Sequence, residues 1–159
     1  MFKKIVGFLL ALCVAFALTG CSQKEEPIQP VEPTKAPAAV YNVGQNVGFD
    51  MITFVIRQGN RVEANVDKGH VVYGIRVAIR NNDTIEIPFK VSNIACFAGN
   101  ERVEIYTGFA DALVDTMIPA ESRLEGWIYY KIPVKHDGLS FAYTYDEKGN
   151  YILFTFEEG

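Results

Sequence analysis

Apolar and polar residues alternate along the middle of this 159-residue chain. In residues 73–79 every second residue is large and apolar (Tyr73, Ile75, Val77 and Ile79), which predicts a strand with one buried face. Short turn sequences separate further runs of strand-forming residues, at 51–57, 85–91, 94–97, 102–106, 124–132, 139–145 and 151–156. This pattern predicts an all-β fold, an antiparallel β-sandwich of about seven to nine strands.

Glycine and asparagine mark the expected turns, because both tolerate the backbone angles that tight turns require. These turns lie at Gly59-Asn60, Gly99-Asn100, residues 136–138 and residues 148–150. Pro88 has no N–H to donate, so it belongs at an edge, a strand end or a bulge. At most one short helical turn is expected after the first 20 residues, between positions 109 and 114.

The first 20 residues follow the order of a secretory signal peptide. Two lysines precede an uncharged apolar run of 14 residues, 5–18, and small residues follow it. An uncleaved membrane anchor is the rival interpretation, but a spanning helix needs about 20 residues. The sequence Leu18-Thr19-Gly20-Cys21 resembles the lipobox of bacterial lipoproteins. That resemblance implies cleavage before Cys21, lipidation of Cys21, and attachment to the extracytoplasmic face of the cell membrane.

Residues 22–39 are rich in proline and charge and contain no aromatic residue. Such a segment cannot bury enough apolar surface to fold, and a proline-rich chain of this length spans about 50 Å. We therefore expect three regions: a signal peptide (1–20), the lipidated cysteine with a disordered linker (21–43), and a β-sandwich domain (44–159). The linker would hold the domain away from the membrane.

Removal of the signal peptide would leave an acidic protein. It takes away two of the 15 basic side chains and leaves 13 against 19 acidic ones, a formal charge of −6. This balance argues against nucleic acid as a partner, and against a second, polybasic contact with anionic lipid. The expected partners are the membrane, through the lipid on Cys21, and an envelope protein or glycan.

The sequence contains no recognisable catalytic constellation. Its two histidines, His70 and His136, are too few for a zinc site built from cysteine and histidine. Nucleophile motifs of the Gly-x-Ser-x-Gly type and phosphate-binding glycine loops are also missing. With Cys13 removed in the signal peptide and Cys21 lipidated, Cys96 has no disulfide partner in the same molecule. A buried apolar role is favoured over a redox or intermolecular one. We expect a non-enzymatic protein without a cofactor or bound metal.

Two aromatic residues on the strand at 124–132 are candidates for ligand binding. Trp127 and Tyr129 share one face of this strand, opposite Ile128 and Tyr130. If that face is exposed, the two rings form a platform for a peptide, a glycan or a protein. If it is covered, they are packing residues. Apolar residues on both faces of the strand favour packing.

Two acidic residues nearby form a second candidate site. Asp111 and Asp115 would share one face of a helical turn, and two adjacent carboxylates could bind Ca²⁺, although a solvated acidic loop is favoured. A solute- or ion-binding lipoprotein that serves a transporter or a sensor is therefore the alternative function. It would need a pocket close to these candidates, lined by Tyr106, Phe109, Asp111, Asp115 and Met117.

The order of several short motifs resembles a known family. A strand ends in the sequence 81–85 (NNDTI), a hairpin carries Ala98-Gly99-Asn100, and the turn 118–122 (IPAES) precedes the strand 125–133, which contains Gly-Trp and ends in Pro. Over about residues 44–146 this order resembles the telokin-like, immunoglobulin-fold domain of unknown function found on bacterial lipoproteins, chiefly Gram-positive ones. Ala120 stands where that family usually has glycine, so a differently shaped turn is expected.

The resemblance implies an immunoglobulin-like sandwich displayed outside the cell. It supplies no catalytic residues, because most members of the family have no established activity. The function expected from the whole sequence is that of a membrane-anchored extracytoplasmic lipoprotein that displays a non-enzymatic binding or interaction domain.

Overall fold

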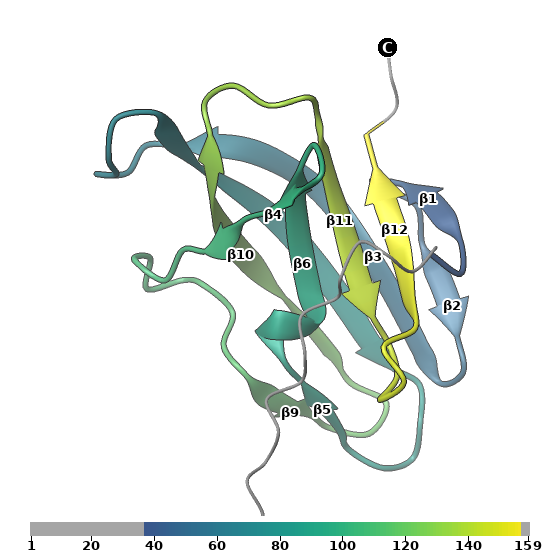
Figure 1. Ribbon diagram of the computed structural model, residues 1–159. Helices are drawn as coiled ribbons and strands as arrows, with labels where there is room; N and C mark the ends of the chain where they lie inside the picture. Colours follow the sequence, from purple (N-terminus) through teal and green to yellow (C-terminus); the bar gives the residue numbers. More distant parts are fainter. Residues whose placement is uncertain (1–36, 157–159) are drawn as a thin grey trace, which may run out of the picture.

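The computed structural model describes residues 37–156 and shows a sandwich of two five-stranded sheets (Figure 1). The signal peptide, Cys21 and most of the predicted linker lie outside the described residues. Sheet A has the spatial order β1 (Val40–Asn42), β12 (Tyr151–Thr155), β11 (Leu139–Thr144), β6 (Ile94–Ala98) and β7 (Glu101–Arg102). Sheet B has the order β2 (Val47–Phe49), β3 (Ile52–Val62), β4 (His70–Asn81), β10 (Arg123–Pro133) and β8 (Glu104–Ile105).

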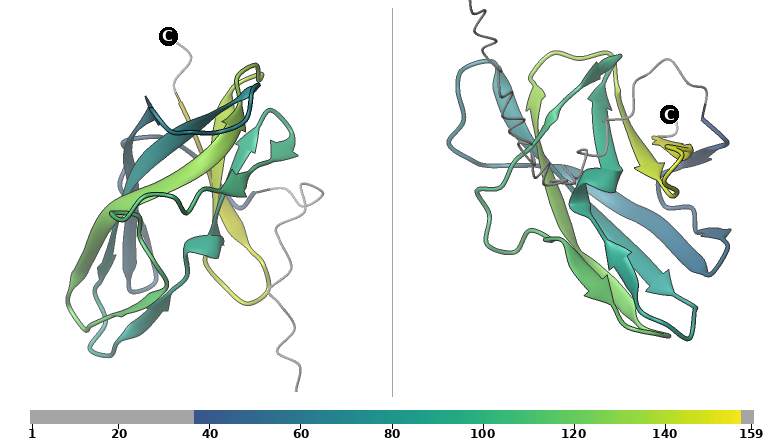
Figure 2. Two further views of the ribbon diagram at one scale, coloured as in Figure 1. Left: turned by 90° about the vertical axis from the view of Figure 1, so that its left-hand side faces the viewer. Right: turned by 60° about the horizontal axis from the view of Figure 1, so that its bottom comes forward.

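The predicted all-β sandwich is confirmed, and the two sheets enclose one main core (Figure 2, left). Sheet B contributes Phe54 and Tyr130 to this core, and sheet A contributes Phe141 and Phe154, all with 0% exposure. Burial of a large apolar side chain of this kind stabilises the fold by about 2–3 kcal/mol. The Tyr130 hydroxyl donates a hydrogen bond to the Ile94 carbonyl at 2.7 Å, so its polar end is satisfied inside the core.

Cys96 lies in the same core and is fully buried, as the sequence favours. Burial raises the pKa of its thiol from the usual 9.0 to about 12. A buried thiol with a raised pKa is unreactive.

Gly59 and Asn60 were predicted to form a turn, and this prediction is wrong. They lie inside β3, which pairs with β4 along nearly its whole length and has a bulge between Ile56 and Gln58. A Cβ atom on Gly59 would lie 2.5 Å from Cε1 of Tyr73, so the glycine makes room for that ring. Glycine within a strand typically marks such a close approach.

The folded domain begins earlier than the predicted boundary at residue 44. Strand β1 lies inside the range 21–43 and pairs in parallel with β12. The Tyr41 ring packs against Phe154, with the ring centroids 5.9 Å apart. A strand of three residues is too short to show a repeating pattern in the sequence, so β1 was not predicted. The same reason applies to strand β2.

The predicted strand 102–106 is divided between the two sheets. Its first part is β7, at the edge of sheet A, and its second part is β8, at the edge of sheet B. Val103 lies between them and donates its N–H to the Cys96 carbonyl at 3.0 Å. The chain therefore crosses from one sheet to the other at a single residue.

A two-stranded ribbon of β5 (Ile87–Phe89) and β9 (Thr116–Ile118) covers one end of the sandwich (Figure 1). Pro88 lies in β5 and faces no third strand, which agrees with its predicted place at an edge. The 3₁₀ turn η1 (Val91–Asn93) follows β5. No helix between residues 37 and 156 is long and apolar enough to cross a membrane.

Asn81 joins this ribbon to sheet B. Its side chain has 0% exposure, and Nδ2 donates to the carbonyls of Ile85 (2.7 Å), Ile118 (3.1 Å) and Pro119 (3.1 Å). Its Oδ1 accepts the N–H of Asp83 at 2.9 Å. One buried amide thus satisfies four backbone groups of the loops that close this end.

The turn that contains Ala120 is held by a hydrogen bond from Ser122 N to Pro119 O at 3.2 Å. The residue with a left-handed backbone in this turn is Glu121, at φ 56°.

Candidate functional site

The two aromatic candidates lie on the outer face of β10, and a neighbouring loop covers one of them. Residues 106–113 run beside β10, where Tyr106 N donates to Tyr129 O and Leu113 N donates to Trp127 O, both at 2.7 Å. The Phe109 ring lies 4.5 Å from the Tyr129 ring, and Tyr129 is only 5% exposed. The packing interpretation is therefore confirmed for Tyr129. Trp127 is partly exposed, with its ring 6.2 Å from that of Tyr129.

The two acidic candidates are held by different partners. The Tyr129 hydroxyl lies 3.0 and 3.1 Å from the two carboxylate oxygens of Asp111. Val91 N donates to Asp115 Oδ1 at 2.8 Å, where η1 begins. Burial, and secondly the hydrogen bond to Asp111, raise the pKa of Tyr129. Each carboxylate thus accepts a protein donor.

At most one short helical turn is expected at 109–114, and no helix forms there. The segment makes a single turn, closed by Ala112 N and Phe109 O at 3.4 Å, and a bridge joins Ala112 to Trp127. The segment stays mostly extended because its pairing with β10 satisfies backbone carbonyl groups at the outer edge of that strand. The structure therefore gathers Tyr106, Phe109, Asp111 and the two β10 aromatics into one packed cluster and leaves Asp115 out of it. Across residues 37–156, no group of three or more His, Cys, Asp or Glu side chains could hold a metal ion.

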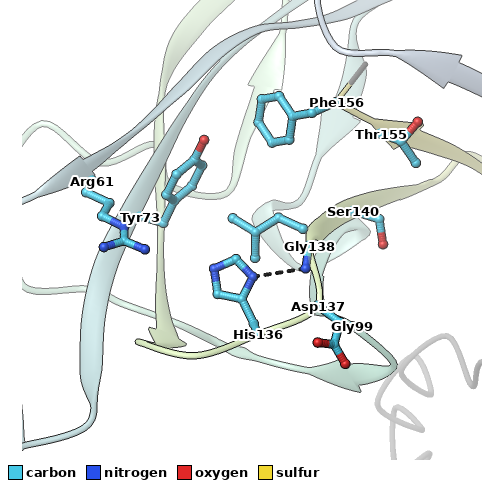
Figure 3. Close-up of a pocket in the computed structure, with 10 residues that line it drawn as sticks. Arg61, Tyr73, Gly99, His136, Asp137, Gly138, Ser140, Thr155 and Phe156 are labelled. Carbon is cyan, nitrogen blue, oxygen red and sulfur yellow. Dashed lines mark hydrogen bonds between the residues drawn. The ribbon is translucent and has the colours of Figure 1, made fainter. Parts of the chain in front are cut away.

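A pocket lies elsewhere, at the end of the sandwich away from the β5–β9 ribbon (Figure 3). It has a volume of about 490 Å³, which is in the usual range for small-ligand sites. We call it the end pocket, and it is lined by Arg61, Tyr73, Gly99, His136, Asp137, Gly138, Leu139, Ser140, Thr155 and Phe156.

Sheet pairing and one tight loop position the side chains of the end pocket. Arg61 and Tyr73 are register partners on β3 and β4. The Tyr73 ring meets Phe156 edge-on, at 6.3 Å between centroids. His136 Nδ1 accepts the N–H of Gly138 at 3.2 Å, which places the proton of a neutral imidazole on Nε2. Gly138 has φ 99°, a conformation that favours glycine.

The end pocket is lined by one arginine, Arg61, and one carboxylate, Asp137, and these two side chains form no ion pair with each other. Arg61 is exposed, and no carboxylate among residues 37–156 lies within ion-pair distance of its guanidinium. Burial raises the pKa of Tyr73, and the charge of Arg61 opposes that shift. Figure 3 shows Arg61, Tyr73 and His136 around one space, with Ser140 pointing away from His136. The arrangement suits a small molecule with an anionic group and a ring.

Sequence reasoning missed the end pocket because its lining comes from five separate segments. The sequence predicts the turn at 136–138, but it does not indicate that this turn lies beside Arg61 of β3. Gly59, which makes room for the Tyr73 ring, is followed by Asn60, and this pair predicts a turn. With a turn at 59–60, the predicted strand ends before Arg61, although Arg61 lies in β3.

The sequence matches one family model, and the structure resembles solved structures that share the β-sandwich fold. A family model described as a domain of unknown function (DUF4352) matches residues 41–151. No curated protein matches the sequence. The yjhA protein of Bacillus subtilis aligns with a TM-score of 0.58 at 17% identity, over 74% of this chain and 99% of its own. The secreted protein MPT63 of Mycobacterium tuberculosis gives 0.58 at 12% identity, over 76% and 98%.

A third similar structure is the ycdA protein of Bacillus subtilis, which is provisionally described as a lipoprotein. Its TM-score is 0.58 at 16% identity, and the alignment covers 69% of this chain. The chain spans 37% of the length of ycdA. At these identities the three structures show a shared β-sandwich fold.

Proposed function

We propose that this chain, which belongs to the DUF4352 family because the family model covers residues 41–151, is a lipid-anchored extracytoplasmic protein that binds a small ring-bearing anion. The observation that carries the proposal is the Arg61 guanidinium, which has no ion-pair partner among residues 37–156 and lines a pocket with aromatic walls. Anchor, linker and compact domain would together display this pocket outside the cell.

The lining residues give each part of such a ligand a partner. Arg61 offers a planar fork of N–H donors that matches a carboxylate or a phosphate. Tyr73 and Phe156 offer ring faces and edges to an apolar or aromatic portion. His136 Nε2 can donate a further hydrogen bond, because its Nδ1 is occupied by Gly138.

The same geometry supports binding in preference to catalysis. The hydroxyl of Ser140 points away from His136, so the two do not form a nucleophile and base pair (Figure 3). The thiol of Cys96 is buried in the core, with its pKa raised to about 12. We therefore propose a non-enzymatic protein that needs no cofactor.

The lipobox-like sequence ending in Cys21 supports the anchor. We propose that Cys21 carries the lipid and that the protein belongs to the telokin-like lipoproteins. Replacement Cys21→Ser should move the protein from the membrane fraction to the soluble fraction and abolish incorporation of a labelled fatty acid. Persistence of the label in Cys21→Ser would contradict the assignment.

Calorimetry on the mature protein in mild detergent tests the pocket. Phenyl phosphate and benzoate should bind, and the neutral benzyl alcohol should bind at least tenfold more weakly. Arg61→Gln should weaken phenyl phosphate binding about tenfold or more, because a charge-assisted hydrogen bond contributes about 1.5–3 kcal/mol. Lys148→Gln, the same charge change in an exposed turn, should leave binding unchanged. Equal binding by Arg61→Gln and the parent would overturn the proposal.

Ca²⁺ binding at Asp111 and Asp115 is the weaker candidate, because both carboxylates already accept protein hydrogen bonds. A rise in melting temperature with CaCl₂ that is lost in Asp111→Asn would favour it. An envelope protein or a glycan could present the anion recognised by the end pocket.

A further inference from the structure

Four arginines that are far apart in sequence lie together on the outer face of sheet B. Arg57 comes from β3, Arg76 and Arg80 come from β4, and Arg123 comes from β10. Arg80 and Arg123 are register partners, and Arg76 is the partner of Trp127, two residues beyond Glu125. All four arginines are exposed. We call these four residues and Glu125 the arginine face.

Glu125 is the carboxylate around which the arginine face is organised. Arg76 Nε lies 2.9 Å and Arg57 Nε 3.5 Å from its Oε1, and Arg123 Nη2 contacts the other oxygen. The side chains of these three arginines are 43–46% exposed, and that of Glu125 is 24% exposed. Arg80 is held separately, through Nε to Asn82 Oδ1 at 3.0 Å. One carboxylate among four guanidinium groups leaves a local charge of +3.

Most of the N–H donors on this face remain available. A guanidinium has five N–H groups, and each arginine uses a single nitrogen in its contacts within the described residues. Two other acidic groups near this sheet are already engaged. Asp111 accepts from Tyr129, and Asp67 pairs with Lys131 at 2.9 Å. The arginines are thus held in place without being neutralised, on a protein that is acidic overall.

We propose that the arginine face binds a phosphodiester polymer, a chain of alcohols joined by phosphates. Guanidinium groups match phosphate oxygens in two-point hydrogen bonds. Arg76 and Arg80 are four residues apart along β4, or about 13 Å at roughly 3.3 Å per residue. Across the sheet the face spans three neighbouring strands, about 10 Å. These dimensions fit two or three successive phosphates of a flexible chain.

The size and surroundings of the arginine face disfavour other anionic partners. A planar membrane would meet the acidic remainder of the domain as well as this small patch. Binding of single-stranded nucleic acid normally adds a series of exposed stacking rings. Beside this face, Trp127 is partly covered and stacks on the buried Tyr129. A polymer of alcohol phosphates needs no rings and can follow the arginines alone.

The test measures binding of poly(glycerol phosphate) chains of about ten units to the mature protein in mild detergent, at 50 mM salt. The double variant Arg57→Gln/Arg80→Gln leaves Arg76 and Arg123 on Glu125, so the fold should persist, and circular dichroism checks this. We expect this variant to bind about 20-fold more weakly, since each basic residue near a charged surface contributes about fivefold. The parent affinity should also fall steeply with salt, as for release of two or three counterions.

The matched control is Lys135→Gln/Lys148→Gln, which loses the same charge at exposed sites away from the face. It should bind like the parent, and so should Arg61→Gln, because the end pocket is a different site. Equal binding by all variants, or no binding at 50 mM salt, would overturn the proposal. Tighter binding of polyglutamate, of an oligothymidylate, or of vesicles containing 30% phosphatidylglycerol would also overturn it, by assigning the arginine face to another partner.

Discussion

The two ends of the sandwich are built from the same long strands yet differ in how their loops are held. At the ribbon end, the buried amide of Asn81 binds three carbonyls and one N–H, and β5 and β9 cover the core. At the other end, Arg61 and His136 face a pocket of about 490 Å³. A loop whose polar groups are satisfied by a buried side chain is fixed, whereas a loop that leaves side-chain donors unused can meet a ligand.

This contrast assigns stability to one end and binding to the other. Strands β3, β4 and β10 run between the two ends, so they carry both properties in one sheet. Mutations at the ribbon end should therefore change unfolding, whereas mutations at the end pocket should change binding with smaller effects on unfolding.

The largest effect should follow Asn81→Ala. This change removes the donor of the buried Ile118 carbonyl and of the part-buried carbonyls of Ile85 and Pro119, and each lost hydrogen bond costs about 1–1.5 kcal/mol. We expect the free energy of unfolding to fall by about 4 kcal/mol in urea titration. Asn82→Ala, an exposed neighbour, should cost less than about 1 kcal/mol. Equal losses in the two variants would remove the contrast between the ends.

The second-largest effect should follow Cys96→Ala, which tests whether water reaches the core from the end that carries the end pocket. The pKa of Cys96 is about 12 in the folded protein and 9.0 in the unfolded chain, so the folded state holds its proton more tightly. Stability from this thiol is therefore complete below pH 9 and is lost as the pH rises from 9 to 12, at up to about 1.4 kcal/mol per pH unit.

In Cys96→Ala the free energy of unfolding should fall less steeply with pH above pH 9, by the equivalent of about one proton. Part of the fall should remain, because burial also raises the pKa values of Tyr130 and Tyr143. Urea titrations at pH 8, 9 and 10 measure the slope. Rapid labelling of Cys96 by a thiol reagent in the native protein would show that the end pocket is continuous with the core.

A smaller effect is expected for Gly59→Ala. The new Cβ would displace the Tyr73 ring, which lies on the wall of the end pocket. The ring can move outwards, so the loss of stability should be only about 1 kcal/mol by urea titration. Phenyl phosphate binding should weaken more clearly. The matched control is Gly48→Ala, at a strand glycine where an added Cβ would meet nothing within 4 Å.

The smallest effect should follow Tyr73→Phe. Its hydroxyl has no hydrogen-bond partner among residues 37–156, so we expect a change below about 0.5 kcal/mol in the free energy of unfolding. Tyr130→Phe is the comparison, because it removes the bond to Ile94 and should cost about 1 kcal/mol or more. A larger loss for Tyr73→Phe than for Tyr130→Phe would show that the end pocket contributes to stability.

The regular strands could be predicted because their pattern is local. Alternation over residues 73–79 identifies β4, and apolar residues on both faces of 124–132 predict that β10 is packed on both sides. The short strands β1 and β2 could not be predicted, because pairing with a distant strand, and not a repeating pattern, creates them. The wrong prediction at Gly59 has the same origin, since the ring that requires a glycine there belongs to another strand.

The sites were harder to predict because they depend on register. Net charge correctly describes an acidic chain, but it says nothing about where positive side chains gather. Arg57, Arg76 and Arg123 meet only because the pairing of β3, β4 and β10 brings them to one carboxylate. The aromatic candidates on β10 were chosen from the strand itself, and the loop that covers Tyr129 is visible only in three dimensions.

The parallel pairing of β1 with β12 has a mechanical consequence. Backbone hydrogen bonds link the two strands from Ala38 N to Tyr151 O (2.8 Å) through Leu153 N to Ala39 O (2.9 Å) and Val43 N to Thr155 O (2.8 Å). The chain enters β1 at one end of this ladder and leaves β12 at the other, beside the end pocket. A pull between an N-terminal tether and a ligand in the pocket would therefore load these bonds together in shear, so they would have to break at once instead of unzipping one by one.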